Sequence, residues 1–237
     1  MPPLFSFLAP LLLLFAFTVK AETITDEETW VNLNAFVKLN EKWQIYGEYQ
    51  PRFFDYQKYN GVVLHRGAIG RKVGHGFSAW VGLGLIVWNQ RNQSKFPAKN
   101  QHEDRPFLML MHAKELGSWK ITNRTRFEQR MFRHTDEGSR RLRHQLRGQY
   151  KFGDSPWAIA AWDEWFYNTN DIYPSARSHA PVTKEGFDQN RAFLGMAYLF
   201  GDKQQHIIET GYMNNYVHGP TRDRNAHVWM TTFTGNL

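Results

Sequence analysis

Hydrophobic and polar residues alternate with a period of two along most of this chain. In residues 77–88, an apolar set that begins at Phe77 alternates with a second set that begins at Ser78. Successive side chains of a β-strand point to opposite faces, so this alternation predicts strands. It predicts eleven of them, at residues 30–39, 43–53, 62–73, 77–88, 105–114, 119–130, 141–152, 157–168, 189–200, 205–216 and 225–234.

The connections between these strands alternate in length. Short ones fall at residues 40–42, 74–76, 116–118, 153–156 and 201–204. Longer polar ones fall at residues 54–61, 89–104, 131–139, 169–186 and 217–224. Short periplasmic turns and longer external loops are typical of outer-membrane barrels. We therefore predict an all-β fold, an antiparallel up-and-down transmembrane β-barrel of about 10–12 strands.

The strand count leaves one question open. Bacterial single-chain barrels have an even number of strands, whereas the pattern gives eleven. Either residues 22–28 form a further short strand, or one element has been drawn wrongly. A secreted meander is the other fold with alternating loop lengths, although one loop set being longer throughout is less expected there.

The predicted hairpin over residues 119–152 has one apolar face and one strongly basic face. A soluble sandwich would bury the apolar face, whereas a membrane barrel would turn it to lipid and the arginines to a wet lumen. The chain has 18 Phe, 10 Tyr and 9 Trp, enough for the aromatic girdles of a barrel. Several lie near predicted strand ends on the apolar face, namely Trp43, Phe77, Trp119, Tyr150 and Tyr198. The chain end, residues 233–237, matches an aromatic-ended last strand poorly.

The first residues resemble an export signal. Leu4 to Phe17 is almost entirely apolar, but it is shorter than the roughly 20 residues that a spanning helix needs. Small residues up to Ala21 then suit signal peptidase. We predict a signal peptide at residues 1–21 and a barrel domain at residues 22–237, located in the cell outer membrane. A buried N-terminal helix is the alternative. The chain has no Cys, so it can form neither a lipoprotein anchor nor a disulfide.

Charged residues on the predicted inward face are the candidate functional residues. They are Arg124, Arg126, Glu128, Arg130, Arg141, Arg143, Arg147, Glu164, Arg191 and Glu209. Opposed strand residues lie about 4.5–5.5 Å apart, so these arginines repel unless carboxylates or water separate them. One interpretation is an ion-pair network, with Glu48 as a further counter-charge, that plugs the lumen. The other is an anion-favouring channel or a site for an acidic ligand, because arginine recognises phosphate and carboxylate through its planar fork.

No enzymatic motif is evident, and we expect no enzyme, cofactor or metal site. Neither Gly-x-Ser-x-Gly nor His-Glu-x-x-His occurs, and His144 falls on the apolar face. A lipid-modifying hydrolase and a structural or adhesive scaffold acting through its loops are the alternatives. The net charge is +7, but an exported chain rarely meets nucleic acid. The expected partners are outer-membrane lipid and small anionic solutes, and the sequence does not define an oligomeric state.

Short motifs spread over the chain resemble those of one bacterial family. They are Trp30 with Trp43, Asn123-Arg124-x-Arg126-x-Glu128-x-Arg130, Arg141-x-Arg143, Glu164, Asn190-Arg191 before Gly195, and Glu209-x-Gly211-Tyr212-Met213. The chain resembles the proteins catalogued as domain of unknown function twenty-four ninety, small predicted outer-membrane barrels. The resemblance implies a fold and a location, and it implies no activity.

Overall fold

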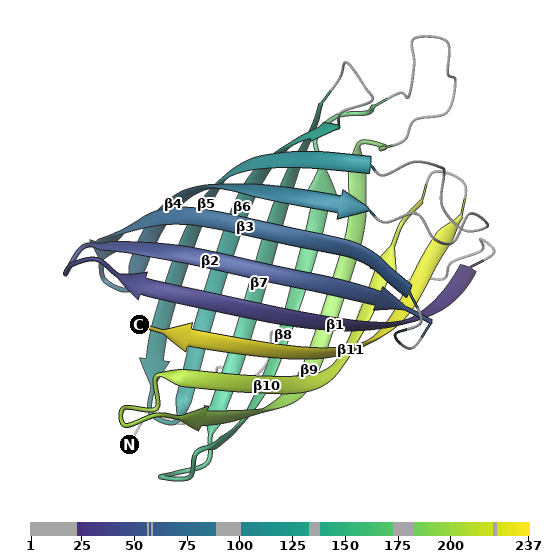
Figure 1. Ribbon diagram of the computed structural model, residues 1–237. Helices are drawn as coiled ribbons and strands as arrows, with labels where there is room; N and C mark the ends of the chain where they lie inside the picture. Colours follow the sequence, from purple (N-terminus) through teal and green to yellow (C-terminus); the bar gives the residue numbers. More distant parts are fainter. Residues whose placement is uncertain are drawn as a thin grey trace, which may run out of the picture.

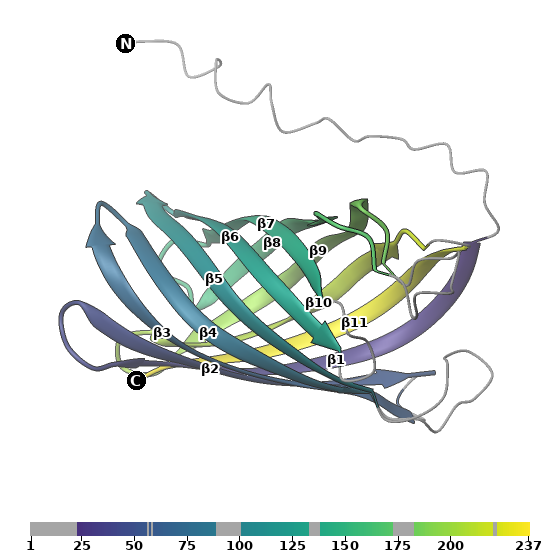
Figure 2. The same ribbon diagram turned by 90° about the horizontal axis from the view of Figure 1, so that it is seen from above.

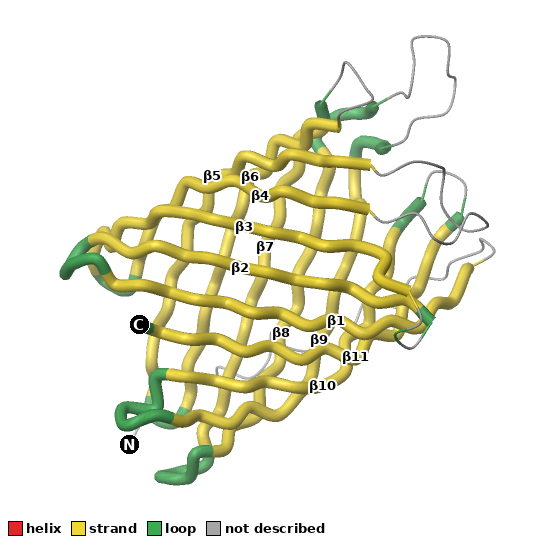
Figure 3. Tube along the Cα trace, viewed as in Figure 1, coloured by secondary structure: helices red, strands yellow, loops and turns green. Residues whose placement is uncertain are grey.

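The structure is a computed structural model that describes residues 23–55, 57, 59–88, 101–132, 138–172, 183–219 and 222–237. The predicted signal peptide, residues 1–21, lies outside the described residues. All named elements of the described chain are β-strands (Figure 3). Their bounds are β1 Thr23–Lys38, β2 Trp43–Phe54, β3 Tyr59–Gly74, β4 Phe77–Trp88, β5 Gln101–Leu116, β6 Trp119–Phe132, β7 Ser139–Lys151, β8 Trp157–Asn168, β9 Gly186–Phe200, β10 His206–Val217 and β11 Asp223–Asn236.

These strands form one closed barrel, in which strands adjacent in sequence are also adjacent in space (Figures 1 and 2). Consecutive strands pair antiparallel, whereas β1 and β11 close the barrel in parallel, from Thr23 opposite Asp223 to Phe36 opposite Asn236. An odd number of alternating strands must bring its first and last members together in the same direction. The predicted all-β barrel is confirmed.

The strand number resolves the question that the sequence left open. The described chain has eleven strands, and Thr23 to Glu28 are the first residues of β1 itself. These residues are therefore not an extra strand, and no predicted strand was wrongly drawn. The rule of even strand number fails here because the parallel pairing of β1 with β11 closes the barrel instead.

Several strands extend further toward the long loops than we predicted. β1 begins at Thr23 instead of Trp30, and β5 begins at Gln101 instead of Arg105. The predicted loop 89–104 is therefore too long by its last four residues, Gln101 to Asp104. Gln101 to Asp104 are all polar, so the segment shows no alternation between an apolar and a polar face and was predicted as a loop. In the structure the inner face is itself polar at this end, as Glu103 and Arg105 are both buried.

The two faces of the wall differ in chemistry. Leu108, on the outer face of β5, is 61% exposed, whereas the adjacent Met109 is 5% exposed. In a barrel whose wall is a single sheet, exposed side chains point outward and buried ones point into the lumen. Large apolar residues are exposed on the outer face of every strand. Within the described residues, no helix is both long and apolar enough to cross a membrane.

Side chains fill much of the interior. Three groups of buried apolar residues pack there. The first is Trp30, Phe193, Met213, Ala226, Val228 and Met230. The second is Tyr46, Ala68, Trp80, Phe107 and Met109. The third is Val62, Leu64 and Ile86, which explains why the predicted strand 62–73 showed apolar residues on both faces.

The two ends of the barrel are unlike. Tight turns and the C-terminus lie at one end, here called the short-turn end, and the longer connections lie at the long-loop end (Figure 1). The turn between β3 and β4 requires glycine, because Gly76 has φ +81° and a Cβ atom there would lie 2.3 Å from the carbonyl oxygen of Ala113. That carbonyl belongs to β5, so the turn packs directly against the neighbouring hairpin.

We expect the tight packing of the inner wall to appear in a matched pair of glycine substitutions on β3. A Cβ added at Gly70 would meet the Trp80 ring at 2.1 Å, whereas one added at Gly67 would meet nothing within 4 Å. Gly70→Ala should therefore lower the free energy of unfolding by about 1–3 kcal/mol. Gly67→Ala should leave it unchanged or raise it by about 0.4–1 kcal/mol, because alanine restricts the unfolded chain. Urea unfolding followed by tryptophan fluorescence measures both, and equal effects would contradict this packing.

Candidate functional site

The structure brings the ten predicted charged residues together inside the barrel. Seven of them are buried, namely Arg126, Glu128, Arg141, Arg143, Glu164, Arg191 and Glu209. The other three, Arg124, Arg130 and Arg147, are partly buried and share the inward face of their strands. Every second residue of β6 and β7 points inward, so the alternating arginines of the sequence become facing rows in the lumen.

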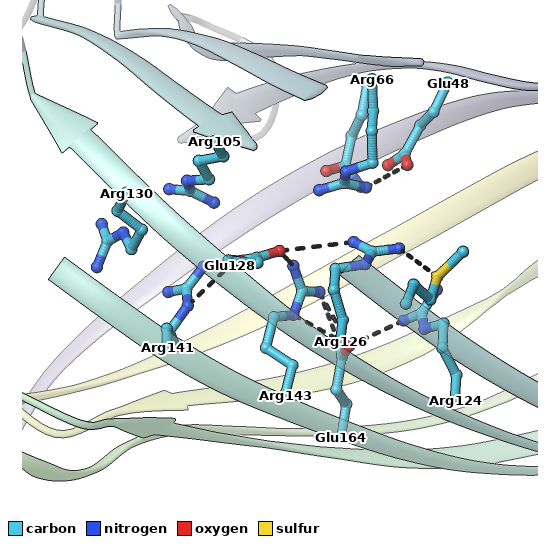
Figure 4. Close-up of polar contacts among 12 residues, drawn as sticks. Glu48, Arg66, Arg105, Arg124, Arg126, Glu128, Arg130, Arg141, Arg143 and Glu164 are labelled. Carbon is cyan, nitrogen blue, oxygen red and sulfur yellow. Dashed lines mark hydrogen bonds and ion pairs between the residues drawn. The ribbon is translucent and has the colours of Figure 1, made fainter. Parts of the chain in front are cut away.

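Two carboxylates join these rows into one network (Figure 4). Glu128 accepts hydrogen bonds from Arg141 NH2 and Arg143 NH1, each at 2.7 Å. Glu164 accepts from Arg143 NH2 at 2.9 Å and from Arg124 NH2 at 2.8 Å. Arg143 therefore bridges the two carboxylates. We call Arg124, Glu128, Arg141, Arg143 and Glu164 the charge belt, which ties β6, β7 and β8 together through their side chains.

Arg126 shows how the belt tolerates arginines on facing strands. It lies directly opposite Arg143 in the β6–β7 register and is 1% exposed. Its NH1 atom lies 3.6 Å from Glu128 Oε1, and its guanidinium stacks 4.7 Å from the centroid of the Phe107 ring. Its NH2 group contacts Met109 Sδ at 3.3 Å, while Nε and NH1 make no hydrogen bond within the described residues. A carboxylate and an aromatic face thus offset the repulsion between these two arginines.

Three of the smaller ion-pair groups in the lumen lie around the belt. Glu103 accepts from Arg105 Nε at 2.5 Å and from Arg130 Nε at 2.6 Å. Glu209 pairs with Arg147, across the lumen from β7 to β10. The third group comprises Glu48, Arg66 and Tyr46, in which the tyrosine hydroxyl donates to the glutamate at 2.5 Å.

Arginine and aromatic side chains stack in alternation across the middle of the lumen. The guanidinium carbon atoms of Arg52 and Arg191 lie 3.7 and 4.8 Å from the centroid of the Trp30 ring. Those of Arg191 and Arg143 lie 4.6 and 4.5 Å from the centroid of the Phe166 ring. Trp30 is 2% exposed and Phe166 is 1% exposed, so these contacts are desolvated, which strengthens a cation–π interaction. We call these five residues the aromatic–arginine layer.

A cavity of about 270 Å³ lies inside the barrel between this layer and the short-turn end. We call it the vestibule. Seven basic and three acidic side chains line it: Arg52, Arg66, Lys120, Arg124, Arg143, Arg147 and Arg191, with Glu48, Glu164 and Glu209. Basic groups exceed acidic ones by four, so the vestibule presents a positive potential. Among the described residues, no group of three or more His, Asp or Glu side chains is placed to hold a metal ion.

Sequence reasoning missed part of this site. Glu103 was assigned to a loop, and Arg66 and Arg105 were not assigned to the lumen. The spacing Glu103-x-Arg105-x-Phe107 carries the same period-two signal as the central hairpin. It was hidden because its inward set passes from charged to apolar residues. Trp30 was predicted only as the start of a strand and as part of the family resemblance, because a tryptophan on a strand gives no sign that arginines will stack on it.

Comparisons with known proteins give a family without an assigned activity. The model of a family described as protein of unknown function (DUF2490) matches residues 27–226, which confirms the resemblance seen in the sequence. An uncharacterized protein of Methylorubrum extorquens is 28% identical over 198 residues, covering 82% of this chain and 80% of that protein. No solved structure matches the chain.

We expect the charge belt to be a large contributor to stability. Glu128→Gln keeps the shape of the side chain but leaves Arg141 and Arg143 without one counter-charge, and removing one partner of a buried pair costs about 3–5 kcal/mol. The matched control is Glu41→Gln, because Glu41 pairs with Lys38 on the surface with its side chain 91% exposed. The control should leave stability nearly unchanged. Equilibrium urea unfolding measures both variants, and an unaltered midpoint for Glu128→Gln would show that water already neutralises the belt.

Proposed function

The chain belongs to the DUF2490 family of proteins of unknown function, and we propose that it is an outer-membrane β-barrel whose lumen is closed. We further propose that its vestibule binds small acidic solutes from the periplasmic side. The observation that carries closure is the aromatic–arginine layer, and the one that carries binding is the excess of basic groups in the vestibule.

The outer surface supports a membrane location. Large apolar side chains are exposed on the outer face of every strand, and tryptophans are exposed where strands meet the short turns, at Trp43, Trp119 and Trp157. Tyr167 and Phe187 are exposed near the long-loop end. An apolar band between two aromatic girdles is the outer surface of a transmembrane barrel. Short turns face the periplasm in such barrels, so the vestibule would open there.

Closure is supported by what the layer and the belt are made of. Trp30 and Phe166 come from β1 and β8, and the arginines that flank them come from β2, β7 and β9. Charged groups that already have partners gain little by moving aside, whereas breaking a buried pair is costly. A solute would have to separate this layer to pass. The barrel is therefore proposed as a binding scaffold with a blocked lumen, distinct from an open porin.

The vestibule is suited to phosphate or carboxylate groups. Arginine presents planar pairs of N–H donors that match both anions. Lys120 lines the vestibule and makes no ion pair within the described residues. Arg124 reaches the vestibule while sharing Glu164 with Arg143. These two side chains are placed to receive an anion without removing the only counter-charge of a neighbour.

We expect the protein to insert into planar bilayers without sustained single-channel conductance. Trp30→Ala removes the ring between Arg52 and Arg191 and should produce repeated openings that favour anions, because the exposed wall is basic. The control is Trp229→Ala, which truncates a tryptophan that is 55% exposed on the outer face. The control should show no sustained conductance. Stable conductance of the unaltered protein would exclude a closed lumen.

We expect phosphate to stabilise the barrel more than chloride does at equal ionic strength. A ligand at 100 times its Kd raises the free energy of unfolding by about 2.7 kcal/mol. Lys120→Gln should lower the apparent phosphate affinity by up to about fivefold. Lys114→Gln should have no effect, since Lys114 lies exposed on the outer face of β5 near the same end. Thermal unfolding across a phosphate series measures this, and identical curves in the two salts would exclude the binding site.

A further inference from the structure

The outer face of β6–β9 carries a polar cluster among apolar neighbours. Thr125 Oγ1 lies 3.0 Å from His144 Nδ1, and Asn190 Nδ2 donates to Asp163 Oδ1 at 2.5 Å. All four alternate with buried residues and therefore point outward. The His144 ring stacks on Trp165, with centroids 6.0 Å apart. We call Thr125, His144, Asp163 and Asn190 the outer polar cluster.

This cluster lies where a lipid-facing surface should be apolar. Thr125, His144 and Asp163 are each near the middle of their strands, β6, β7 and β8. If the barrel spans the outer membrane as proposed above, these side chains are near mid-bilayer. Ionisable groups at that depth are costly against lipid tails, and they normally face protein or water instead.

The hydrogen bonds within the cluster do not use all of its capacity. Thr125 occupies His144 Nδ1, and Nε2 has no partner within the described residues. The Asp163 carboxylate accepts from Asn190, and a carboxylate can accept about four hydrogen bonds in all. In the tautomer whose Nδ1 accepts from the Thr125 hydroxyl, Nε2 carries the proton and offers a donor at one edge of the cluster. The Asp163 carboxylate on the neighbouring strand offers an acceptor.

The donor and the acceptor are arranged to complement a second copy of the same surface. His144 and Asp163 lie on adjacent strands at similar depth, and Asp163 is opposite Leu146, two residues from His144. A two-fold axis normal to the membrane between β7 and β8 would set β7 of one copy against β8 of the other. In a two-fold contact, residue i of one copy meets residue j of the other, and the reverse also holds. His144 of each copy would then face Asp163 of its partner.

We propose that the barrel forms a parallel homodimer through the outer faces of β7 and β8, with reciprocal His144–Asp163 contacts at its centre. This rests on the proposed membrane location. The apolar residues around the cluster would complete the contact, since Leu146 is 38% exposed and Trp165 is 47% exposed. The occupant is a second copy, because the cluster supplies both halves of the hydrogen-bonded pair.

The absence of cysteine makes this dimer testable by single-thiol cross-linking in lipid vesicles. Leu146→Cys would lie near the two-fold axis, where two Cα atoms can approach to the 4.4–6.8 Å that a disulfide requires. We expect mild oxidation to give a dimer band on a non-reducing gel. The control is Leu83→Cys, exposed on β4, which should remain monomeric.

A charge exchange tests the contact itself. In the Leu146→Cys chain, His144→Asp should lower dimerisation about tenfold or more, because two contacts per dimer become repulsive. Adding Asp163→His to that variant should restore the dimer. Cross-linking that is equal at positions 83 and 146, or unchanged by His144→Asp, would overturn the interface.

The same gels separate this inference from the proposed function. Folded membrane barrels migrate differently before and after boiling, so each variant reports its own insertion. A heat-modifiable barrel that stays monomeric would overturn the dimer and leave the closed membrane barrel standing. A chain that never becomes heat-modifiable in lipid would overturn the membrane location, and the dimer with it.

Discussion

Neutralising buried arginine is the constraint on which the interior of this barrel depends. Glu128 and Glu164 lie between arginines of three strands, and Arg143 hydrogen-bonds to both. Because a buried charge without a partner is far more costly than an exposed one, each of these side chains fixes the positions of the others. The proposed closure of the lumen would follow from the same constraint. The groups that would have to move aside for a solute are those that keep one another's charge compensated.

Polar side-chain contacts also support the parallel junction, or seam, between β1 and β11. Parallel pairing is slightly less stable per residue than antiparallel pairing, and β1 pairs with β11 in this way along nearly its whole length. Side chains from the two strands contact each other at two positions along this seam. Arg224 pairs with Asp26 and Glu28 near the long-loop end, and Asn32 donates to Thr232 at 3.1 Å further along. Polar contacts inside the lumen therefore support the one junction that strand alternation cannot make antiparallel.

Period-two alternation was enough to predict a barrel of about 10–12 strands and the inward rows of β6 and β7. It succeeded where one face is apolar and the other charged, as at Arg124 and Phe127. It did not show which face of β3 points inward, because that face mixes apolar and basic residues: Val62, Leu64 and Arg66 are all buried there. The partners of each arginine could not be predicted, since Glu209 reaches Arg147 across the lumen from a distant strand. Such contacts depend on barrel diameter and stagger, which no local pattern encodes.

The charge belt and the outer polar cluster meet at one short segment of β8. Glu164 points inward to Arg143, while its neighbour Asp163 points outward to Asn190. Asn190 Nδ2 also lies 3.4 Å from the backbone carbonyl oxygen of Glu164, so one side chain holds both positions. A partner on the outside would therefore restrain the segment of β8 that positions the carboxylate of the belt. In the proposed dimer, the contact between barrels would thus reinforce the closure of each lumen, although the two lie on opposite faces of the sheet.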